Sequence, residues 1–194
     1  WSSSLELAIR LINWSITWQI IGGEHSPLFK GKKGDQFKQL WLKSIFQQMH
    51  FIKGHFSRFS SANNHLIGEA AGLFISTITW PFWSDGKHWN QIAKDILEIE
   101  TLRQNDTEGV NREQTTSYQQ FVLDFLLLAG LAGNFGGVQF SGAFWGRLEH
   151  MMEFISSMIN GAGDMPMIGD ADDGLVVRLS LEQGWNPFRS LLTI

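Results

Sequence analysis

The sequence predicts an all-α chain made of stacked antiparallel helical hairpins. In six segments of roughly 16–20 residues, apolar side chains recur every three or four positions, the period of a helix with one buried face. Glycines, a proline or polar turns separate these segments, and period-two alternation of apolar and polar residues is almost absent. Because successive helices joined by short loops pack side by side in opposite directions, the six segments are expected to form three hairpins.

The first helix is expected over residues 3–21. Ser3 or Ser4 caps its first turn, and Gly22 with Gly23 ends it, as glycine commonly does. One stripe of the helix is apolar and is expected to face the core. Its members are Leu5, Ala8, Ile9, Ile12, Ile16 and Ile20.

The second helix is expected over about residues 36–53. Residues 30–34 precede it as a polar, glycine-bearing loop, and Asp35 provides its cap. Residues 54–63 then form the loop that leads into the third helix.

The third helix is expected to begin at Asn63 or Asn64, because an asparagine side chain accepts a hydrogen bond from an otherwise unpaired first-turn amide. It ends near Trp80, since Pro81 disfavours helical geometry in the residue before it. Its core-facing residues recur every four positions and are Leu66, Ala70, Phe74 and Ile78.

The fourth helix is expected to start at Ser84 or Asp85 and to run to about Asn105. Its apolar residues at helical spacing predict the buried face. They are Trp89, Ile92, Ile96, Ile99 and Leu102.

The fifth helix is expected over residues 111–131, since its first residue can cap it and Gln114, three residues later, completes a capping-box-like start. The sixth is expected over residues 141–160, between two glycine-rich stretches. Residues 175–179 have a short extended pattern, and a terminal helix is expected from about Asn186.

Composition excludes several classes of function. The net charge is −4 and there is no polybasic run, so the chain lacks the electrostatic footprint of a nucleic-acid or membrane-surface protein. No apolar stretch approaches the ~20 residues that a membrane span needs. There is no cysteine, and the six histidines show no H-x-x-x-H or H-E-x-x-H spacing. The acidic run at 170–174 departs from EF-hand spacing, so we expect no metal and no cofactor.

The chain opens on Trp1 without a visible signal peptide and stops within a helical pattern. We therefore expect residues 1–194 to be a single helical domain of a longer protein. The absence of cysteine fits a bacterial periplasmic or secreted protein, and a cytoplasmic one as well.

The start of the third helix is the best candidate for an anion site. Asn64 and His65 stand at the helix mouth, where free amides and the positive end of the helix dipole favour a negative charge. Glu69 lies one turn beyond His65 and could hold the imidazole in one orientation. The alternative is a well-capped helix with a structural histidine.

Basic residues near this start could give an acidic chain a local patch for an acidic ligand. They are His50, Lys53, His55, Arg58, His65 and Arg112. The alternative is that they are scattered, solvated charges.

Three blocks of the sequence carry a resemblance to a known family. They are SSANNHLIGEAAGLF at 60–74, GVNREQTTSYQQFVLDF at 109–125 and MPMIGDADDG at 165–174. In these blocks, their order and their spacing, the chain resembles the helical domain of the heparinase II/III family of polysaccharide lyases. The resemblance implies an (α/α) toroid, here incomplete, and a β-sandwich region that follows the helical domain and is absent from residues 1–194.

The resemblance also implies a reaction and its residues. The family cleaves uronic-acid glycans by β-elimination, and heparin-like, alginate-like and exopolysaccharide substrates are all open. Asn64 matches the asparagine that holds the uronate carboxylate, His65 an assisting histidine, and Tyr118 the tyrosine that protonates the leaving oxygen. Asn63, Glu69 and Arg112 are expected to contact the substrate, an anionic polysaccharide or oligosaccharide.

Other interpretations stay open at this point. Tyr118 shares a helical stripe with Phe121 and Phe125, so it could instead be a core ring with a satisfied hydroxyl group. The whole domain could be a non-catalytic glycan-binding scaffold. It could also be a glycoside hydrolase on a similar barrel, which needs two carboxylates facing one pocket.

Overall fold

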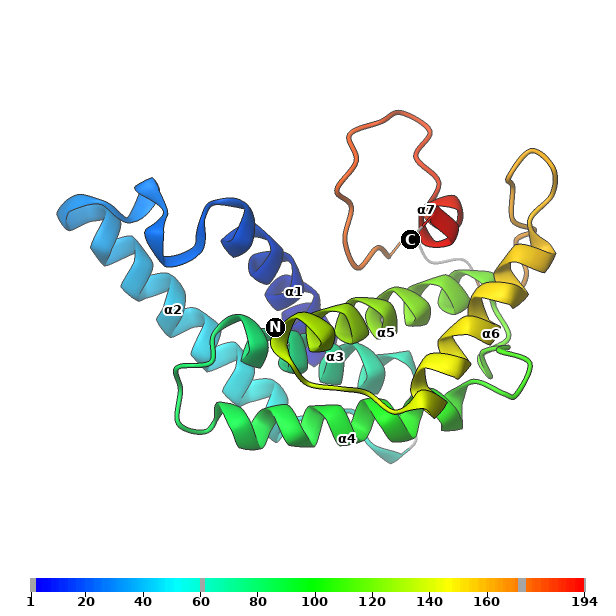
Figure 1. Cartoon of the computed structure of the whole chain (residues 1–194), viewed down its shortest axis with the longest axis horizontal. Helices are drawn as coiled ribbons and strands as arrows, with labels where there is room; N and C mark the ends of the chain where they lie inside the picture. Colours follow the sequence, from blue (N-terminus) through cyan, green and yellow to red (C-terminus); the bar gives the residue numbers. More distant parts are fainter. Residues whose placement is uncertain (1–2, 60–61, 171–173, 194) are drawn as a thin grey trace.

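In the computed structural model, residues 3–59, 62–170 and 174–193 are described. The all-α prediction is confirmed, because these residues contain helices and one isolated bridge between Asn105 and Asn111 but no strand. The helices are α1 (Ser4–Ile20), α2 (Gly31–Gly54), α3 (Asn64–Thr79), α4 (Gly86–Gln104), α5 (Thr116–Gly136), α6 (Gly142–Met158) and α7 (Pro187–Thr193), with the 3-10 turns η1 (Gly23–His25) and η2 (Pro27–Phe29) (Figure 1).

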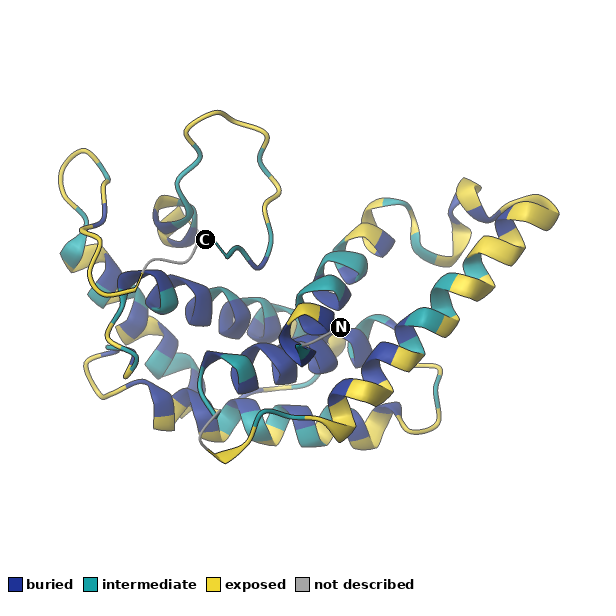
Figure 2. Ribbon diagram, turned by 180° about the vertical axis from the view of Figure 1, so that it is seen from behind, coloured by how far each residue is buried: buried dark blue, intermediate teal, exposed yellow. Residues whose placement is uncertain are grey.

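Helix α3 is the centre of the packing. It contacts α1, α4 and α5, and it is buried along almost its whole length, whereas much of α2 is exposed (Figure 2). Glycines allow the close approach: a Cβ atom at Gly72 would lie 2.6 Å from the Cα atom of Ala8, and one at Gly68 would lie 2.8 Å from the ring of Phe125. A helix with apolar residues on most of its sides is expected to be an interior helix, and α3 is one.

Helices α3 and α5 run parallel to each other. Helix α4, which connects them in the sequence, runs antiparallel to both. Gly68 of α3 lies against Phe125, and ten residues later Ile78 lies against Gly136 at the end of α5. The antiparallel return of α4 is marked by a hydrogen bond between Asn90 and Thr77 at one end. The N-terminal ends of α3 and α5 therefore lie at the same end of the molecule.

The boundaries of α3 agree with the sequence, and those of α2 do not. Asn63 caps α3 and Trp80 follows its last residue. Helix α2 begins at Gly31, so the predicted loop at 30–34 is wrong. The reason is close packing: a Cβ atom at Gly34 would lie 2.5 Å from the carbonyl carbon of Phe29, so this glycine permits a helical turn there rather than breaking one.

Helix α5 starts later and ends later than expected. Thr115, not Asn111, caps it, through a 3.0 Å hydrogen bond from the Tyr118 amide to the Thr115 hydroxyl oxygen. Residues 111–114 form a turn in which Gln114 has a left-handed φ of 56°. The helix continues to Gly136, because glycine at this position leaves room for Ile78 of α3.

The buried face of α4 was also misplaced. Trp89, Ala93 and Leu97 are buried, whereas Ile99 is 61% exposed and Leu102 is 39% exposed. The last turns of α4 instead bury the polar residues Glu100, Thr101 and Gln104. The side-chain amide of Gln104 donates to the Glu100 carboxylate at 2.9 Å and to the Ala62 carbonyl, in the loop before α3, at 3.4 Å.

The C-terminal part has little regular structure besides the short α7, which begins close to the expected position. The extended segment predicted at 175–179 forms no strand in the described part of the chain. The central residues of the acidic run, 171–173, lie outside the described residues, as do 60–61 of the first sequence block. Among the described helices, none has both the length and the apolar character that a membrane span requires.

Candidate active site

The start of α3 is a capped helix end with a buried asparagine. Asn63 is the cap: its Oδ1 atom accepts a 3.1 Å hydrogen bond from the backbone N–H of His65. Asn64 follows as the first helical residue and is 4% exposed. The side chain of Asn63 is thus committed to the helix end, while the amide of Asn64 faces the next polar group.

That group is Glu113, which the sequence did not single out. Its carboxylate accepts hydrogen bonds from the Nδ2 atom of Asn64 at 3.1 Å (Oε1) and 2.9 Å (Oε2), and from the backbone N–H of Asn64 at 3.0 Å (Oε1). The expectation of a negative charge at this helix mouth is therefore met by a group of the chain itself. Glu113 belongs to the second sequence block, and its position two residues before the cap of α5 is the only local signal for it.

Buried amides hold the turn that carries Glu113. The Oδ1 atom of Asn111 accepts from the Glu113 N–H at 3.0 Å, and the Nδ2 atom of Asn111 donates to Asn105 at 3.0 Å. Gln119 accepts from the Asn111 N–H at 2.7 Å and donates to the Gly109 carbonyl at 2.9 Å. Such a satisfied buried polar network favours one conformation of the loop, and it links the start of α5 to the start of α3.

His65 and Glu69 lie one turn apart on α3, as expected, but the carboxylate of Glu69 accepts hydrogen bonds from Ser57. Its Oε1 atom accepts from the Ser57 hydroxyl at 2.7 Å and its Oε2 atom from the Ser57 N–H at 2.6 Å. Burial raises the pKa of Glu69, while the hydrogen bonds from Ser57 and the nearby His65 lower it. Glu69 is 0% exposed, and its carboxylate anchors the loop before α3, so its expected contact with a substrate stays a prediction that the structure does not support.

Tyr118 lies in the first turn of α5 and is half-buried against the core. It is therefore neither sealed in the interior nor fully exposed. It lies five positions after Glu113, which binds Asn64, so Asn64 and Tyr118 belong to the same end of the molecule. The two residues on which the sequence-based assignment depends therefore both lie at the N-terminal end of the pair α3 and α5, and their shared role stays a prediction.

Besides His65, the predicted basic residues divide into two groups. The rings of His50 and His55 lie against aromatic neighbours, with His55 stacked 4.1 Å from Phe51. Lys53, Arg58 and Arg112 are exposed and form no salt bridge with an acidic side chain of the described residues. The structure thus leaves three exposed cations in the segments that flank α3 and α5.

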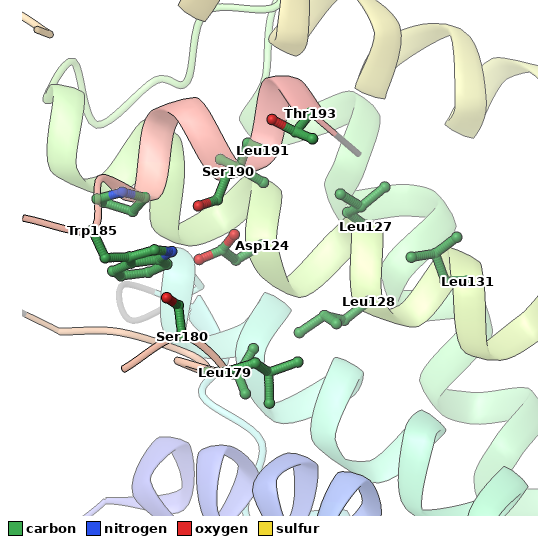
Figure 3. A pocket seen from close by; sticks show the side chains of 12 residues that line it. Asp124, Leu127, Leu128, Leu131, Leu179, Ser180, Trp185, Ser190, Leu191 and Thr193 are labelled. Carbon is green, nitrogen blue, oxygen red and sulfur yellow. The ribbon is translucent and has the colours of Figure 1, made fainter. Parts of the chain in front are cut away.

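A second polar feature lies elsewhere, in a cavity of about 600 Å³ between α5 and residues 177–193 (Figure 3). Asp124 points into it, near Ser180, Trp185 and Ser190, among leucine side chains. Burial raises the pKa of Asp124 to about 7, and a hydrogen bond from Gln120 partly opposes the rise. The described residues contain no group of three or more histidine, aspartate or glutamate side chains placed to hold a metal ion.

Comparisons with known proteins agree with this architecture. The family described as Heparinase II/III N-terminus matches residues 1–189. The heparin-sulfate lyase of Pedobacter heparinus is 24% identical over 137 residues, which make up 70% of this chain and 20% of that protein.

Solved structures show the same fold. The crystal structure of a heparan sulfate lyase from Pedobacter heparinus matches with a TM-score of 0.66 and 22% identity, over 86% of this chain and 25% of that one. A heparinase III structure matches with a TM-score of 0.67 and 20% identity, over 87% and 25%. The chain therefore spans about a fifth to a quarter of the length of these relatives. With nearly all of its residues matched, the chain belongs to the heparinase II/III family.

Proposed function

We propose that this chain is the helical catalytic part of a polysaccharide lyase, which cleaves a uronic-acid-containing glycan by β-elimination. The observation that carries the proposal is the fixed amide of Asn64 at the mouth of α3, at the same end of the molecule as Tyr118 of α5. The similar proteins include a heparin-sulfate lyase and a heparan sulfate lyase, which supports a uronate glycan as the substrate class.

The chemistry explains why an amide at a helix mouth is useful. Elimination removes the C5 proton of a uronate, and the electrons that remain add negative charge beside an existing carboxylate. Hydrogen-bond donors that meet this carboxylate lower the barrier, because they stabilise the enolate as it forms. The side-chain amide of Asn64 is such a donor, and the positive end of α3 acts in the same direction.

The leaving sugar needs a proton at O4. In the proposed reaction the phenol of Tyr118 gives its proton to this oxygen as the C4–O4 bond breaks, and the double bond forms between C4 and C5. A half-buried phenol at a helix start can reach a bound ligand while its ring stays packed on the core. The exposed Lys53, Arg58 and Arg112 would attract the anionic chain toward this end of the molecule.

The proposal places residues 1–194 within a longer enzyme. The matched part of this chain makes up only 20–25% of the relatives, so the remaining groups of the site, including a base or histidine from a following β-sandwich region, are assigned to the rest of the protein. In the same way, the hairpins described above are proposed to continue into an (α/α) toroid.

The test is an elimination assay on the full-length protein. Heparan sulfate and alginate are incubated with it, and the ultraviolet absorbance of the new C4–C5 double bond is recorded. We expect a rise with at least one of these glycans, and a loss of about 10²- to 10³-fold in kcat for Asn64→Ala. The matched control is Asn134→Ala, the same substitution at an exposed position near the far end of α5, which should keep the wild-type rate.

Three outcomes would contradict the proposal. Undiminished turnover by Asn64→Ala would remove the amide from the mechanism. Cleavage of the glycan without a chromophore would indicate hydrolysis, and binding without cleavage would indicate a glycan-binding scaffold.

A further inference from the structure

We infer that Glu113 is a positioning residue, which fixes the side-chain amide of Asn64 in the orientation that receives the substrate carboxylate. This inference rests on the proposed function and extends it to a residue that contacts Asn64 rather than the substrate. It is carried by the three hydrogen bonds between the two residues, which link the turn at 111–114 with α3.

The carboxylate determines which way the amide of Asn64 faces. An ionised carboxylate only accepts hydrogen bonds, so the Nδ2 atom, and not the Oδ1 atom, must face Glu113. The reversed amide would place its oxygen against two carboxylate oxygens and would lose both hydrogen bonds. Without Glu113, the two orientations of the amide would no longer differ in the hydrogen bonds that they make to a carboxylate.

The arrangement leaves one amide N–H of Asn64 for a ligand. The two oxygens of one carboxylate subtend a narrow angle at the Nδ2 atom, whereas its two N–H bonds diverge widely. Only one N–H can therefore be directed at Glu113, although both oxygens lie within 3.1 Å of the nitrogen. The other N–H points away from Glu113, and it is the donor that the elimination chemistry requires.

Glu113 binds the side chain of Asn64 in addition to placing a negative charge at the start of α3. A capping acid needs to bind only backbone N–H groups, and here the Oε1 atom does accept from the Asn64 N–H. The Oε2 atom, however, accepts from the side-chain amide at 2.9 Å, the shorter of the two side-chain contacts. The second oxygen is thus used for orientation of the asparagine side chain.

The turn holds Glu113 in place. The N–H of Glu113 donates to the Oδ1 atom of Asn111, which is 1% exposed and is itself held by Asn105 and Gln119. Directly after Glu113, the left-handed backbone of Gln114 turns the chain into the cap of α5. A carboxylate on so constrained a backbone can restrict the amide that it binds.

The experiment is a double-mutant cycle in the full-length protein, with heparan sulfate as the probe and alginate where heparan sulfate is not cleaved. Glu113→Ala should lower kcat/KM by about 10²-fold, since a misoriented donor loses its effect on the transition state. In the Asn64→Ala background the same change should have less than about a twofold effect, because the group through which Glu113 acts is gone. The kcat/KM of Glu113→Gln, which keeps one acceptor oxygen, should lie between that of the wild-type protein and that of Glu113→Ala.

A structural role predicts a different pattern. If Glu113 only stabilised the loop, Glu113→Ala would lower kcat/KM by the same factor in both backgrounds, and that result would overturn the inference, as would a wild-type rate for Glu113→Ala. Glu98→Ala is the matched control: Glu98 also accepts from a backbone N–H and a side chain, those of Ser141, but at a partly exposed position of α4, far along the chain from Asn64. It should leave kcat/KM unchanged.

A binding cycle separates this inference from the proposed function. In the Tyr118→Phe background, the affinity for heparan sulfate should fall by the same factor for Glu113→Ala, Asn64→Ala and the two together. Multiplicative losses in this cycle would overturn the role of Glu113 even if Glu113→Ala proved too unstable for kinetics, with Glu113→Gln then taking its place. Absence of any chromophore from the wild-type protein would instead count against the lyase assignment.

Discussion

The two ends of the parallel pair α3 and α5 differ in chemistry. At the N-terminal end, the side chains of Asn64 and Glu113 bind each other, and the carboxylate of Glu69 binds Ser57. At the C-terminal end the contact between the two helices is apolar, because Gly136 of α5 packs against Ile78 of α3. The same two helices thus carry a buried polar network at one end and ordinary hydrophobic packing at the other.

The difference shows that buried, hydrogen-bonded polar groups between α3 and α5 are concentrated at the N-terminal end of the pair. Desolvation of a carboxylate or an amide is unfavourable unless every hydrogen bond is made, and packing alone would not call for such groups. Their concentration at one end of the pair matches the end that carries Tyr118. The following predictions test this comparison, from the largest expected effect to the smallest.

The largest effect is expected for Tyr118→Phe. The substitution removes only the hydroxyl group, so the ring should keep its packing against the core while the proton for the leaving oxygen is lost. We expect kcat for glycan cleavage by the full-length protein to fall by about 10³-fold or more, with the affinity for the glycan nearly unchanged. A rate within threefold of the wild-type rate would show that the phenol takes no part in the reaction.

Two carboxylates that bind a serine in the same way offer a second test. Glu69 binds the N–H and hydroxyl groups of Ser57 in the interior, and Glu98 binds those of Ser141 at the surface. Glu69→Ala leaves buried donors without partners and should lower the free energy of unfolding by about 2–3 kcal/mol, whereas Glu98→Ala should cost about 1 kcal/mol or less. Urea denaturation of both variants measures the difference, and equal losses would contradict the role of burial.

The third prediction concerns pH and Asp124. Its pKa of about 7 in the folded protein exceeds its ordinary value of 3.8, so between these values the folded state binds a proton that the unfolded state releases. The free energy of unfolding should therefore fall as pH rises from about 4 to 7 and stay low above that range. At 1.36 kcal/mol per pKa unit the fall is on the order of 2–4 kcal/mol, with the lower figure favoured by the partial solvent access of the cavity.

Asp124→Asn removes this titration and serves as the control. Denaturation at pH 5 and pH 8 should show a smaller pH dependence for the variant than for the wild-type protein. Equal pH dependence of the two proteins would show that Asp124 titrates normally.

The smallest effect is expected at Gln114. Its left-handed backbone costs a residue with a side chain about 1–2 kcal/mol, which glycine avoids at the expense of greater freedom in the unfolded chain. Gln114→Gly should therefore change the free energy of unfolding by no more than about 1 kcal/mol in the stabilising direction. A loss of more than that amount in thermal or urea denaturation would mean that the Gln114 side chain itself supports the turn.

The sequence predicted those features that local chemistry determines. The cap at Asn63 and the end of α3 before Pro81 follow from neighbouring residues, and both were correct. The start of α5 was misplaced because two capping signals compete there, and Thr115, rather than Asn111, is the residue with the capping hydrogen bond. The buried face of α4 was misplaced because its last turns bury Glu100 and Gln104, whereas Ile99 is exposed, and hydrophobic periodicity cannot anticipate such an exchange.

The candidate site was predicted only in part, because its contacts join residues that are far apart in the sequence. Resemblance located Asn64 and Tyr118, but the pairing of Asn64 with Glu113 joins residues 49 positions apart and depends on the parallel packing of α3 and α5. The contact of Glu69 with Ser57 likewise depends on how the preceding loop folds back onto α3. Neither partner is visible in the periodicity or the composition of the sequence.

The most direct test of the account is the structure of the full-length Tyr118→Phe variant with a bound uronate oligosaccharide. We predict that the uronate carboxylate lies within hydrogen-bond distance of the Asn64 Nδ2 atom, on the side away from Glu113, with the glycosidic oxygen beside residue 118. A sugar bound elsewhere, for example in the cavity of Asp124, with Asn64 untouched, would contradict the claim that the N-terminal ends of α3 and α5 form one elimination site.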